Sequence, residues 1–286
     1  MENLHLILPE IFISLSIMFL LILGVFKKNS SILIHNISLL ILLITTVIIF
    51  NESIEIEKMF LFNGSVVIDY LSSLMKMVTL LAAFIVLAIS KSYLKIFKIL
   101  KIEYPILILS SVLGMMIMIS SNDLIVFYMG LELQSLALYV LATFNRDNLK
   151  SSEAGLKYFV LSALSSGLLL YGCSLIYGFA GSTNFSTIAV QLNSDEQVFT
   201  FGIVFILVGL AFKISAVPFH MWAPDVYEGS PTTVTLFFTM VPKIAALTVF
   251  IRFLYVPFLN MIDQWQMILV FISIASMLFG AIAAIG

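Results

Sequence analysis

The stretch GLAFKISAVPFHMWAPDVYEGSPTTVTLFFTMVPK, residues 209–243, decides how this chain is predicted to fold. It begins and ends in apolar runs, yet it contains two lysines, a histidine and four prolines. Hydrocarbon tolerates such residues only where protein or water surrounds them. Pro218 cannot donate a backbone hydrogen bond, so the helix is expected to break one residue after Lys213, at Ile214. Lys243 directly follows Pro242, and we predict a second break there.

The composition around this stretch is that of a membrane protein. Of 286 residues, 61% are hydrophobic and 10% are charged, and the mean hydropathy is +1.14. An ordinary soluble domain has roughly 25% charged residues. The apolar segments, about 16 to 25 residues long, suit helices that cross about 30 Å of hydrocarbon and not the short alternating strands of a barrel. We therefore predict an all-α polytopic membrane helix bundle.

The chemistry-bearing residues give no sign of a redox or catalytic centre. Cys173 is the only cysteine and the three histidines are scattered, so the sequence has no thiolate or histidine framework for a metal, haem or iron–sulfur cluster. It contains no glycine-rich phosphate loop after a strand and no catalytic triad with usable spacing. A net charge of −2 without a basic tail gives no reason to expect nucleic acid. We expect no cofactor in this chain.

Apolar windows predict about nine spans. The first is too long and too evenly apolar for a secretory signal, so we predict a retained helix. Small residues between Leu161 and Gly172 predict close helix contact in the sixth span. The nine ranges are 4–26, 32–50, 69–90, 103–119, 123–144, 154–179, 199–219, 232–255 and 265–286.

The loops between these spans alternate in charge. Those after odd-numbered spans are basic, with Lys27, Lys28, Lys91, Lys95, Lys98, Lys101, Arg146 and Lys150. Those after the second, fourth and sixth spans have one lysine, Lys58, and are otherwise acidic, with Glu52, Glu55, Glu57, Asp123, Asp195 and Glu196. Because basic loops stay on the cytoplasmic side, the N-terminus is predicted to lie outside. The region 220–231 then lies inside and has the composition of a turn.

Three ionisable residues are predicted to lie near one level of the membrane. At a rise of 1.5 Å per residue, Glu132 lies about 13 Å into its span, and Lys213 and Lys243 each lie about 16 Å into theirs. A carboxylate facing lipid at a helix centre costs at least about 2.5 to 3.5 kcal/mol, so Glu132 is expected to face the bundle. Lys213 is its candidate partner, either in a proton relay or in a purely structural ion pair.

Other charged positions leave two interpretations open. Lys157 follows Glu153 by four residues, so it either supports a pathway or forms an ordinary helical pair. His220 is either a proton relay at the inner mouth or an interfacial residue bonded to the broken backbone. Lys76 is expected to extend outward to the membrane surface. Two acidic residues near His220 are expected to shape the loop, and these are Asp225 and Glu228.

Three segments carry a family resemblance. GLELQSLALYVLA (130–142), EAGLKYFVLSALSSGLLLYG (153–172) and AFKISAVPFHMWAPDVYEGSPT (211–232) resemble the subunit N family of the proton-pumping NADH:quinone oxidoreductase, respiratory complex I. The mitochondrial members of that family are called NADH dehydrogenase subunit 2. The match begins at about Leu100.

The resemblance implies an antiporter-like proton translocase of the respiratory chain with a broken seventh helix. Glu132, Lys213 and Lys243 match the family's proton-relay residues, and Lys157 and His220 match supporting positions. NADH, flavin, iron–sulfur clusters and quinone (ubiquinone) belong to the whole complex. The implied partners are other membrane-arm subunits, including antiporter-like subunit M and small subunits, and lipid. The implied location is the bacterial inner membrane, with the mitochondrial inner membrane as the alternative.

The length departs from the family pattern of fourteen helices in two inverted five-helix repeats. We expect an N-terminal three-helix segment (1–102), a first repeat (103–255) and the start of an incomplete second repeat (256–286), as in a fragment or a split protein. The sequence leaves two other functions open. One is a subunit of a multi-subunit cation/proton antiporter, and the other is a non-conducting scaffold fragment.

Overall fold

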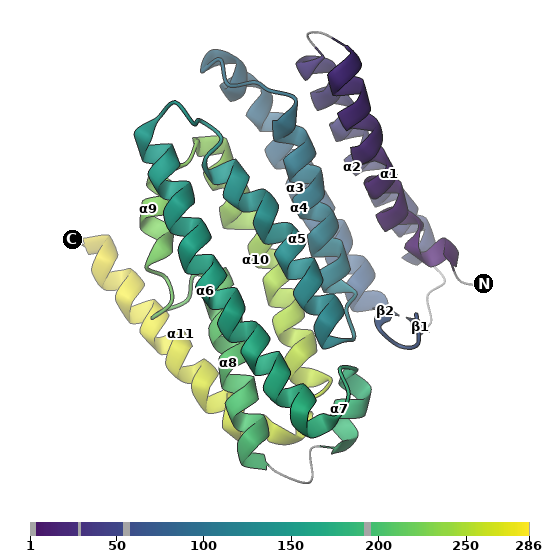
Figure 1. The fold of residues 1–286 in the computed structure, drawn as a ribbon, viewed down its shortest axis with the longest axis vertical. Helices are drawn as coiled ribbons and strands as arrows, with labels where there is room; N and C mark the ends of the chain where they lie inside the picture. The colour runs from purple at the N-terminus through teal and green to yellow at the C-terminus, as the bar shows by residue number, and fades with distance from the viewer. Residues whose placement is uncertain (1–3, 28–29, 54–57, 192–195, 286) are drawn as a thin grey trace.

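The computed structural model describes residues 4–27, 30–53, 58–191 and 196–285, and they form a bundle of helices (Figure 1). Each of the nine predicted spans falls on an apolar helix of the described part, so the predicted class is confirmed. Seven of these helices are long and apolar enough to cross a membrane, and the two shorter ones lie at Glu103–Ile119 and Phe199–Ile214. The α-helices are α1 (Leu8–Phe26), α2 (Ser31–Ser53), α3 (Tyr70–Ile96), α4 (Glu103–Ile119), α5 (Leu124–Ala142), α6 (Leu149–Ala180), α7 (Phe185–Gln191), α8 (Glu196–Ile214), α9 (Trp222–Gly229), α10 (Thr232–Tyr255) and α11 (Ile262–Ile285).

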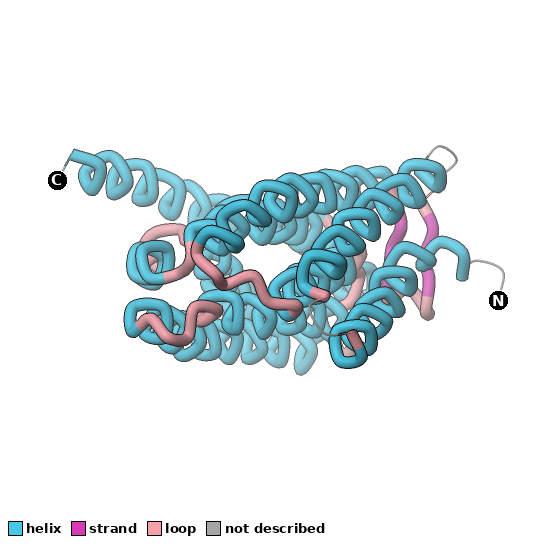
Figure 2. Tube along the Cα trace, turned by 90° about the horizontal axis from the view of Figure 1, so that it is seen from above, coloured by secondary structure: helices cyan, strands magenta, loops and turns pink. Residues whose placement is uncertain are grey.

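Short elements complete the described fold. Leu4–Ile7 and Leu259–Met261 are single turns of 3₁₀ helix. Strands β1 (Met59–Leu61) and β2 (Val66–Ile68) form an antiparallel hairpin, which the sequence analysis did not predict. Figure 2 shows this hairpin at the side of the bundle opposite the free end of α11.

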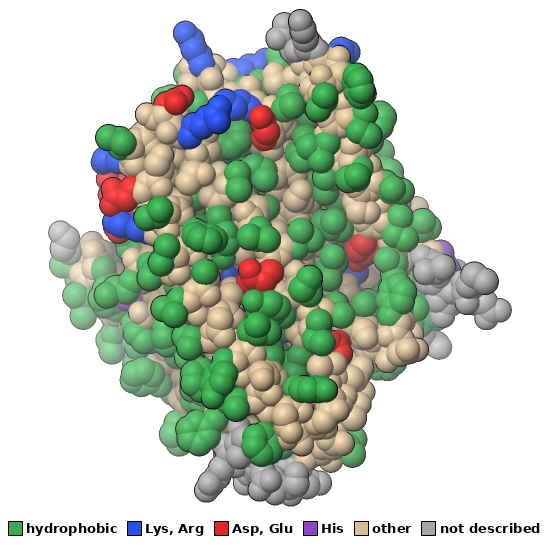
Figure 3. Space-filling view, in the orientation of Figure 1, with side chains coloured by type: hydrophobic (Ala, Val, Ile, Leu, Met, Phe, Trp, Pro, Cys, Tyr) green, Lys and Arg blue, Asp and Glu red, His purple; other side chains and the backbone are tan. Residues whose placement is uncertain are grey.

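The charged loops gather at the end of the bundle where α1, α3 and α5 finish and α9 lies (Figure 1). In Figure 3, most of the blue side chains lie at this end, whereas red side chains lie both there and in the middle, where green hydrophobic side chains surround them. The described basic loop residues therefore share one end, as their alternation predicted. Lys28, Glu55, Glu57 and Asp195 lie outside the described residues.

Glycines bring the helices of the candidate site into close contact. A Cβ atom on Gly114 of α4 would lie 2.5 Å from the backbone nitrogen of Gln134 on α5. The predicted contact of the sixth span is also present, because a Cβ on Gly172 would lie 2.7 Å from the carbonyl oxygen of Gly202 on α8. Small residues allow this approach, which is how membrane helices gain packing contact.

The predicted helix break directly after Lys213 is confirmed, but two neighbouring predictions are wrong. Helix α8 ends at Ile214, and Ser215 adopts a left-handed conformation with φ of 61°. The region 220–231, expected to be a turn, contains the two-turn helix α9. Pro242 does not break α10, which runs through it without interruption. Pro242 removes one helical hydrogen bond, and its side chain is buried within α10.

Lys76 is also placed differently from the prediction. Its side chain is only 5% exposed and forms an ion pair with Glu10 of α1. The charge stays inside the protein because α1 supplies a carboxylate, which is less costly than leaving a charge in hydrocarbon. Glu10 was not predicted as a partner, because it lies in the first turn of its helix.

A second ion pair ties α3 to α10. The Asp69 carboxylate caps α3 by accepting a hydrogen bond from the Ser72 backbone, and it accepts two more from Arg252 at 2.8 and 3.1 Å. Burial alone would raise the pKa of Asp69. The hydrogen bonds and positive charge of Arg252, with those of Ser72, outweigh burial and hold the pKa below its usual value.

Asp69→Asn is therefore expected to destabilise the protein by about 3 kcal/mol at neutral pH, because Arg252 loses its anionic partner. Because the pKa of Asp69 is lower in the folded state than in the unfolded state, the ionised carboxylate stabilises the folded protein at every pH above the unfolded pKa. This stabilisation is lost as the pH falls through the folded pKa. Thermal unfolding in detergent should show acid destabilisation below about pH 4 that is smaller in the variant. Asp147→Asn, at an exposed loop carboxylate, is the control. Equal acid sensitivity of wild type and Asp69→Asn would contradict this role.

Candidate functional site

The ammonium group of Lys213 lies in a cradle of hydroxyl groups. Lys213 is in the last turn of α8 and is 8% exposed. Its Nζ atom donates hydrogen bonds to Ser135 Oγ of α5 at 2.8 Å and to Ser162 Oγ of α6 at 2.7 Å. The Tyr139 hydroxyl donates to the same Ser162 oxygen at 2.7 Å. We call Ser135, Tyr139 and Ser162 the hydroxyl cradle.

Glu132 lies on α5, one helical turn before Ser135. Its candidate partner Lys213 forms no direct ion pair with it, because no carboxylate oxygen lies within 4.0 Å of the Lys213 Nζ atom among the described residues. Glu132 itself is partly buried. Its Oε1 atom is buried without a hydrogen-bond partner in the described structure. In the described part of the chain, neutral hydroxyls and not a carboxylate therefore hold the lysine.

Aromatic packing fixes the backbone break that places Lys213. The Trp222 indole N–H donates a 3.0 Å hydrogen bond to the carbonyl of Phe212, near the end of α8. The Trp222 ring stacks against Tyr158 of α6, with centroids 4.6 Å apart, and against Phe212 at 5.5 Å. The broken segment thus folds back onto α6, which satisfies part of the backbone that the break exposes.

Lys243 lies in the middle of α10 and contacts an aromatic ring. Its Nζ atom lies 5.6 Å from the centroid of Tyr227 on α9, a cation–π distance. The Tyr227 hydroxyl lies 3.5 Å from the Ser215 hydroxyl, two residues after Lys213. Tyr227 is therefore placed between the broken end of α8 and Lys243.

His220 is not in contact with Lys213. Its ring packs 4.3 Å from that of Phe279 on α11, and its Nδ1 atom is buried without a hydrogen-bond partner among the described residues. It lies in the segment between α8 and α9, on the side of the break that leads to the charged end. Pro218 lies in the same segment and follows a cis peptide bond.

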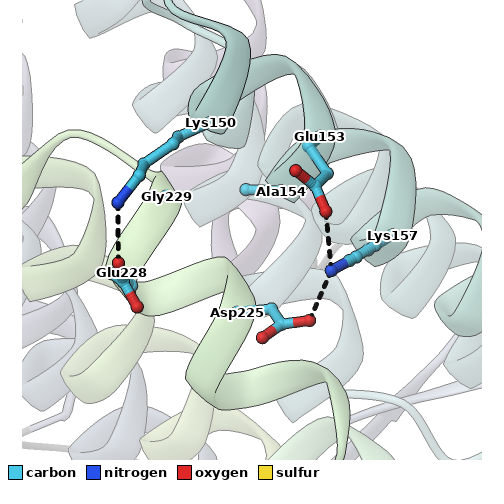
Figure 4. A pocket seen from close by; sticks show the side chains of 7 residues that line it. All are labelled: Lys150, Glu153, Ala154, Lys157, Asp225, Glu228 and Gly229. Carbon is cyan, nitrogen blue, oxygen red and sulfur yellow. Dashed lines mark hydrogen bonds and ion pairs between the residues drawn. The ribbon is translucent and has the colours of Figure 1, made fainter.

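Lys157 belongs to a separate charged cluster at the end of the bundle, shown in Figure 4. It pairs with Glu153 at 2.8 Å, as the helical spacing predicted, and with Asp225 of α9 at 2.6 Å. Lys150 pairs with Glu228 at 2.9 Å. The two acidic residues expected only to shape a loop therefore bind α9 to the first turns of α6.

Residue patterns indicate the charges of the site but not their hydroxyl partners. Ser135 could have been found, because it lies three residues after Glu132 and so shares its helix face. Ser162 and Tyr227 gave no such signal, because folding alone brings their helices together. In the described part of the chain, no group of three or more His, Cys, Asp or Glu side chains could hold a metal ion.

The fold and the site define a multi-span helical membrane protein with a buried lysine at the end of an interrupted helix. Residues 121–286 match the family described as "NADH:quinone oxidoreductase/Mrp antiporter, TM". The chain belongs to this family.

Two curated relatives of this chain have the same name. The chain is 74% identical, over all 286 residues, to "NADH-quinone oxidoreductase subunit N" of Pelagibacter ubique, and the match covers 60% of that protein. It is 51% identical, over 98% of its length, to the subunit N of Parvibaculum lavamentivorans, covering 58% of that protein. The chain thus spans about three fifths of the length of these curated relatives.

Solved structures agree in fold. A chain of "Respiratory complex I from Thermus thermophilus with bound Aureothin" is 31% identical, with a TM-score of 0.74 over 85% of this chain and 52% of that one. A chain of the Mrp complex from Dietzia sp. DQ12-45-1b is 22% identical, with a TM-score of 0.84 over 99% of this chain and 55% of that one. The second likeness concerns the fold alone.

Ser162→Ala is expected to destabilise the protein by about 1 to 3 kcal/mol, because the buried Lys213 ammonium loses one of its two acceptors. In a Lys213→Met background the same substitution should cost much less, since no charge then needs the hydroxyl. Thermal unfolding of the four proteins in this double-mutant cycle measures the difference. An equal loss in both backgrounds would show that Ser162 does not support the lysine.

Proposed function

We propose that this chain forms part of a proton-translocating membrane-arm subunit of NADH:quinone oxidoreductase. Electron transfer elsewhere in the complex would drive protonation changes at Glu132, Lys213 and Lys243. The observation that carries the proposal is the hydroxyl cradle, which keeps a buried lysine hydrogen-bonded without a direct carboxylate partner. The names of the relatives support the assignment to this enzyme.

The separation of Glu132 from Lys213 suits a site that changes its protonation state. A direct ion pair would hold the lysine permanently charged, whereas a distant carboxylate has an influence that depends on its position. Charge interactions are weakly screened in the protein interior. A small movement of Glu132 would therefore change the free energy of protonating Lys213, and about 1.4 kcal/mol changes that equilibrium tenfold.

A proton released by Lys213 would move toward Lys243 past the broken end of α8 and α9. Ser215 and Tyr227 place two hydroxyl groups between the end of α8 and the Lys243 ammonium. Hydroxyl groups both donate and accept hydrogen bonds, so they can pass a proton along a chain. We assign Tyr227 to this link, in addition to the residues that the family resemblance implied.

Lys157 and His220 have supporting roles in this proposal. His220 would exchange protons between solvent and the broken segment, supported by its place between α8 and α9 and by its unpartnered Nδ1 atom. Lys157 would anchor α9, because it already has two carboxylate partners. Pro218 would keep the segment from continuing as a helix.

The rest of the assembly follows from the same proposal. The chain would hold no redox cofactor, and NADH, flavin, iron–sulfur clusters and quinone would bind other subunits. It would lie in the bacterial inner membrane with its N-terminus outside, next to other antiporter-like and small membrane-arm subunits. Residues 103–255 would be the first five-helix repeat, preceded by 1–102 and followed by the start of a second repeat in 256–286.

The family description also includes Mrp antiporters, so a cation/proton antiporter subunit is the second candidate. It predicts Na⁺-dependent proton movement without NADH. Redox-driven pumping predicts that NADH oxidation acidifies the far side of a membrane vesicle. Recording both in vesicles that contain the assembled complex discriminates the two functions.

Lys213→Arg is expected to lower NADH-driven proton pumping at least tenfold while the complex still assembles. Guanidinium stays protonated at all physiological pH values, so the residue could not cycle a proton. Lys95→Arg, at an exposed position, is the matched control. Full pumping by Lys213→Arg, measured as the ratio of protons moved to NADH oxidised, would favour a scaffold role.

Tyr227→Phe is expected to reduce pumping severalfold and leave thermal stability nearly unchanged. The variant keeps the ring that contacts Lys243 but removes the hydroxyl near Ser215. Tyr255→Phe provides the control, because Tyr255 is exposed at the end of α10. If Tyr227→Phe pumps like wild type and Lys213→Arg does not, the proton passes from Lys213 by another route.

A further inference from the structure

Glu10 and Lys76 form a buried ion pair at the end of the bundle opposite the charged end (Figure 1). Glu10 lies in the first turn of α1, and Lys76 lies in the second turn of α3. Their side chains are 12% and 5% exposed. Side chains of a helix lean toward its N-terminus, so Lys76 reaches back toward the end where α1 begins. The proposed relay through Lys213 does not use this pair.

The carboxylate of Glu10 is only partly satisfied. Its Oε1 atom accepts a hydrogen bond from the Lys76 ammonium, but its Oε2 atom is buried without a hydrogen-bond partner in the described structure. A buried polar atom left unpaired costs about 1 to 3 kcal/mol, and more when the group is charged. A proton needs no cavity, so it can bind this carboxylate without separating the helices.

Glu52 is a second carboxylate at the same end. It lies in the last turn of α2, which packs against α1 and α3 and runs in the opposite direction to both (Figure 1). Glu52 is half-buried and forms no ion pair with a described residue. Three adjoining helix ends therefore bring together two carboxylates and one ammonium, so one negative charge is in excess when all three groups are ionised.

Among the described residues near this end, the other ionisable side chains do not supply the missing positive charge. Asp69 at the start of α3 already binds Arg252 of α10. Lys58 and His5 are exposed, so water and salt screen their charges. Over its length Glu103–Ile119, α4 has ionisable side chains only in its first turn, which lies at the charged end.

A proton from solvent can balance the excess charge. Burying a charge that lacks an opposite charge is costly, and two carboxylates that share a site disfavour each other's ionisation. Because Glu52 is half-buried at a helix end, it gives solvent access to the cluster.

We propose that Glu10, Lys76 and Glu52 form a second proton-binding site, which takes up one proton from the solvent at this end of the bundle. The proton would enter at Glu52 and be shared by the two carboxylates. A carboxylate oxygen gains the proton and water loses it, while Lys76 remains an ammonium bound to Glu10. The site does not depend on the proposed pumping through Lys213.

Infrared difference spectroscopy of the assembled complex, which holds the full-length subunit, tests this site. The C=O stretching band of protonated carboxyl groups is recorded as the pH is lowered from about 8 to about 5, a range in which an ordinary carboxylate stays largely ionised. The wild type is expected to gain a band that Glu10→Gln and Glu52→Gln each lose, because either substitution leaves the cluster neutral without a proton. Asp263→Asn, at an exposed carboxylate in the first turn of α11, should leave the band unchanged.

Two more variants make the test independent of stability and of pumping. Lys76→Gln leaves two carboxylates without an ammonium, so the band should already be present at about pH 8. The band should persist in Lys213→Arg, so this inference and the proposed pumping can fail separately. A band that survives Glu10→Gln but not Glu52→Gln would show that Glu52 titrates alone. A wild type without a band that these variants remove would show a purely structural ion pair, and either result overturns the proposal.

Discussion

The structure depends on the burial of a lysine ammonium among helices that offer it no direct carboxylate. Lys213 is held by Ser135 and Ser162, and both hydroxyls come from helices other than its own. An ammonium in a dry interior needs hydrogen-bond acceptors wherever it cannot reach water. Helices α5, α6 and α8 must therefore keep their relative positions, and the close glycine contacts along α4, α5, α6 and α8 do this.

The broken helix makes that burial possible and also connects the site to the rest of the bundle. Ending α8 at Ile214 exposes backbone groups that an unbroken helix would have satisfied. Trp222 returns to bind one of these carbonyls, and α9 then brings Tyr227 to Lys243. The interruption thus positions Lys213, brings Trp222 to a free backbone carbonyl and places Tyr227 against Lys243.

The ion pairs outside this site fix the arrangement of whole elements. Glu10 with Lys76 joins α1 to α3, and Asp69 with Arg252 joins α3 to α10. At the charged end, the pairs on α9 bind it to the first turns of α6. Because α10 carries Lys243 and α9 carries Tyr227, these distant contacts determine where the functional groups meet.

The sequence by itself determined the membrane class, the nine apolar segments, the break after Lys213 and the ionisable residues Glu132 and Lys243. These follow from local rules, since hydropathy sets spans and a proline removes one N–H. Only the tertiary structure decided that hydroxyls hold Lys213, that Lys76 is buried against Glu10 and that Pro242 stays within a helix. Each of those outcomes depends on what a neighbouring helix offers, and residue spacing within one helix does not contain that information.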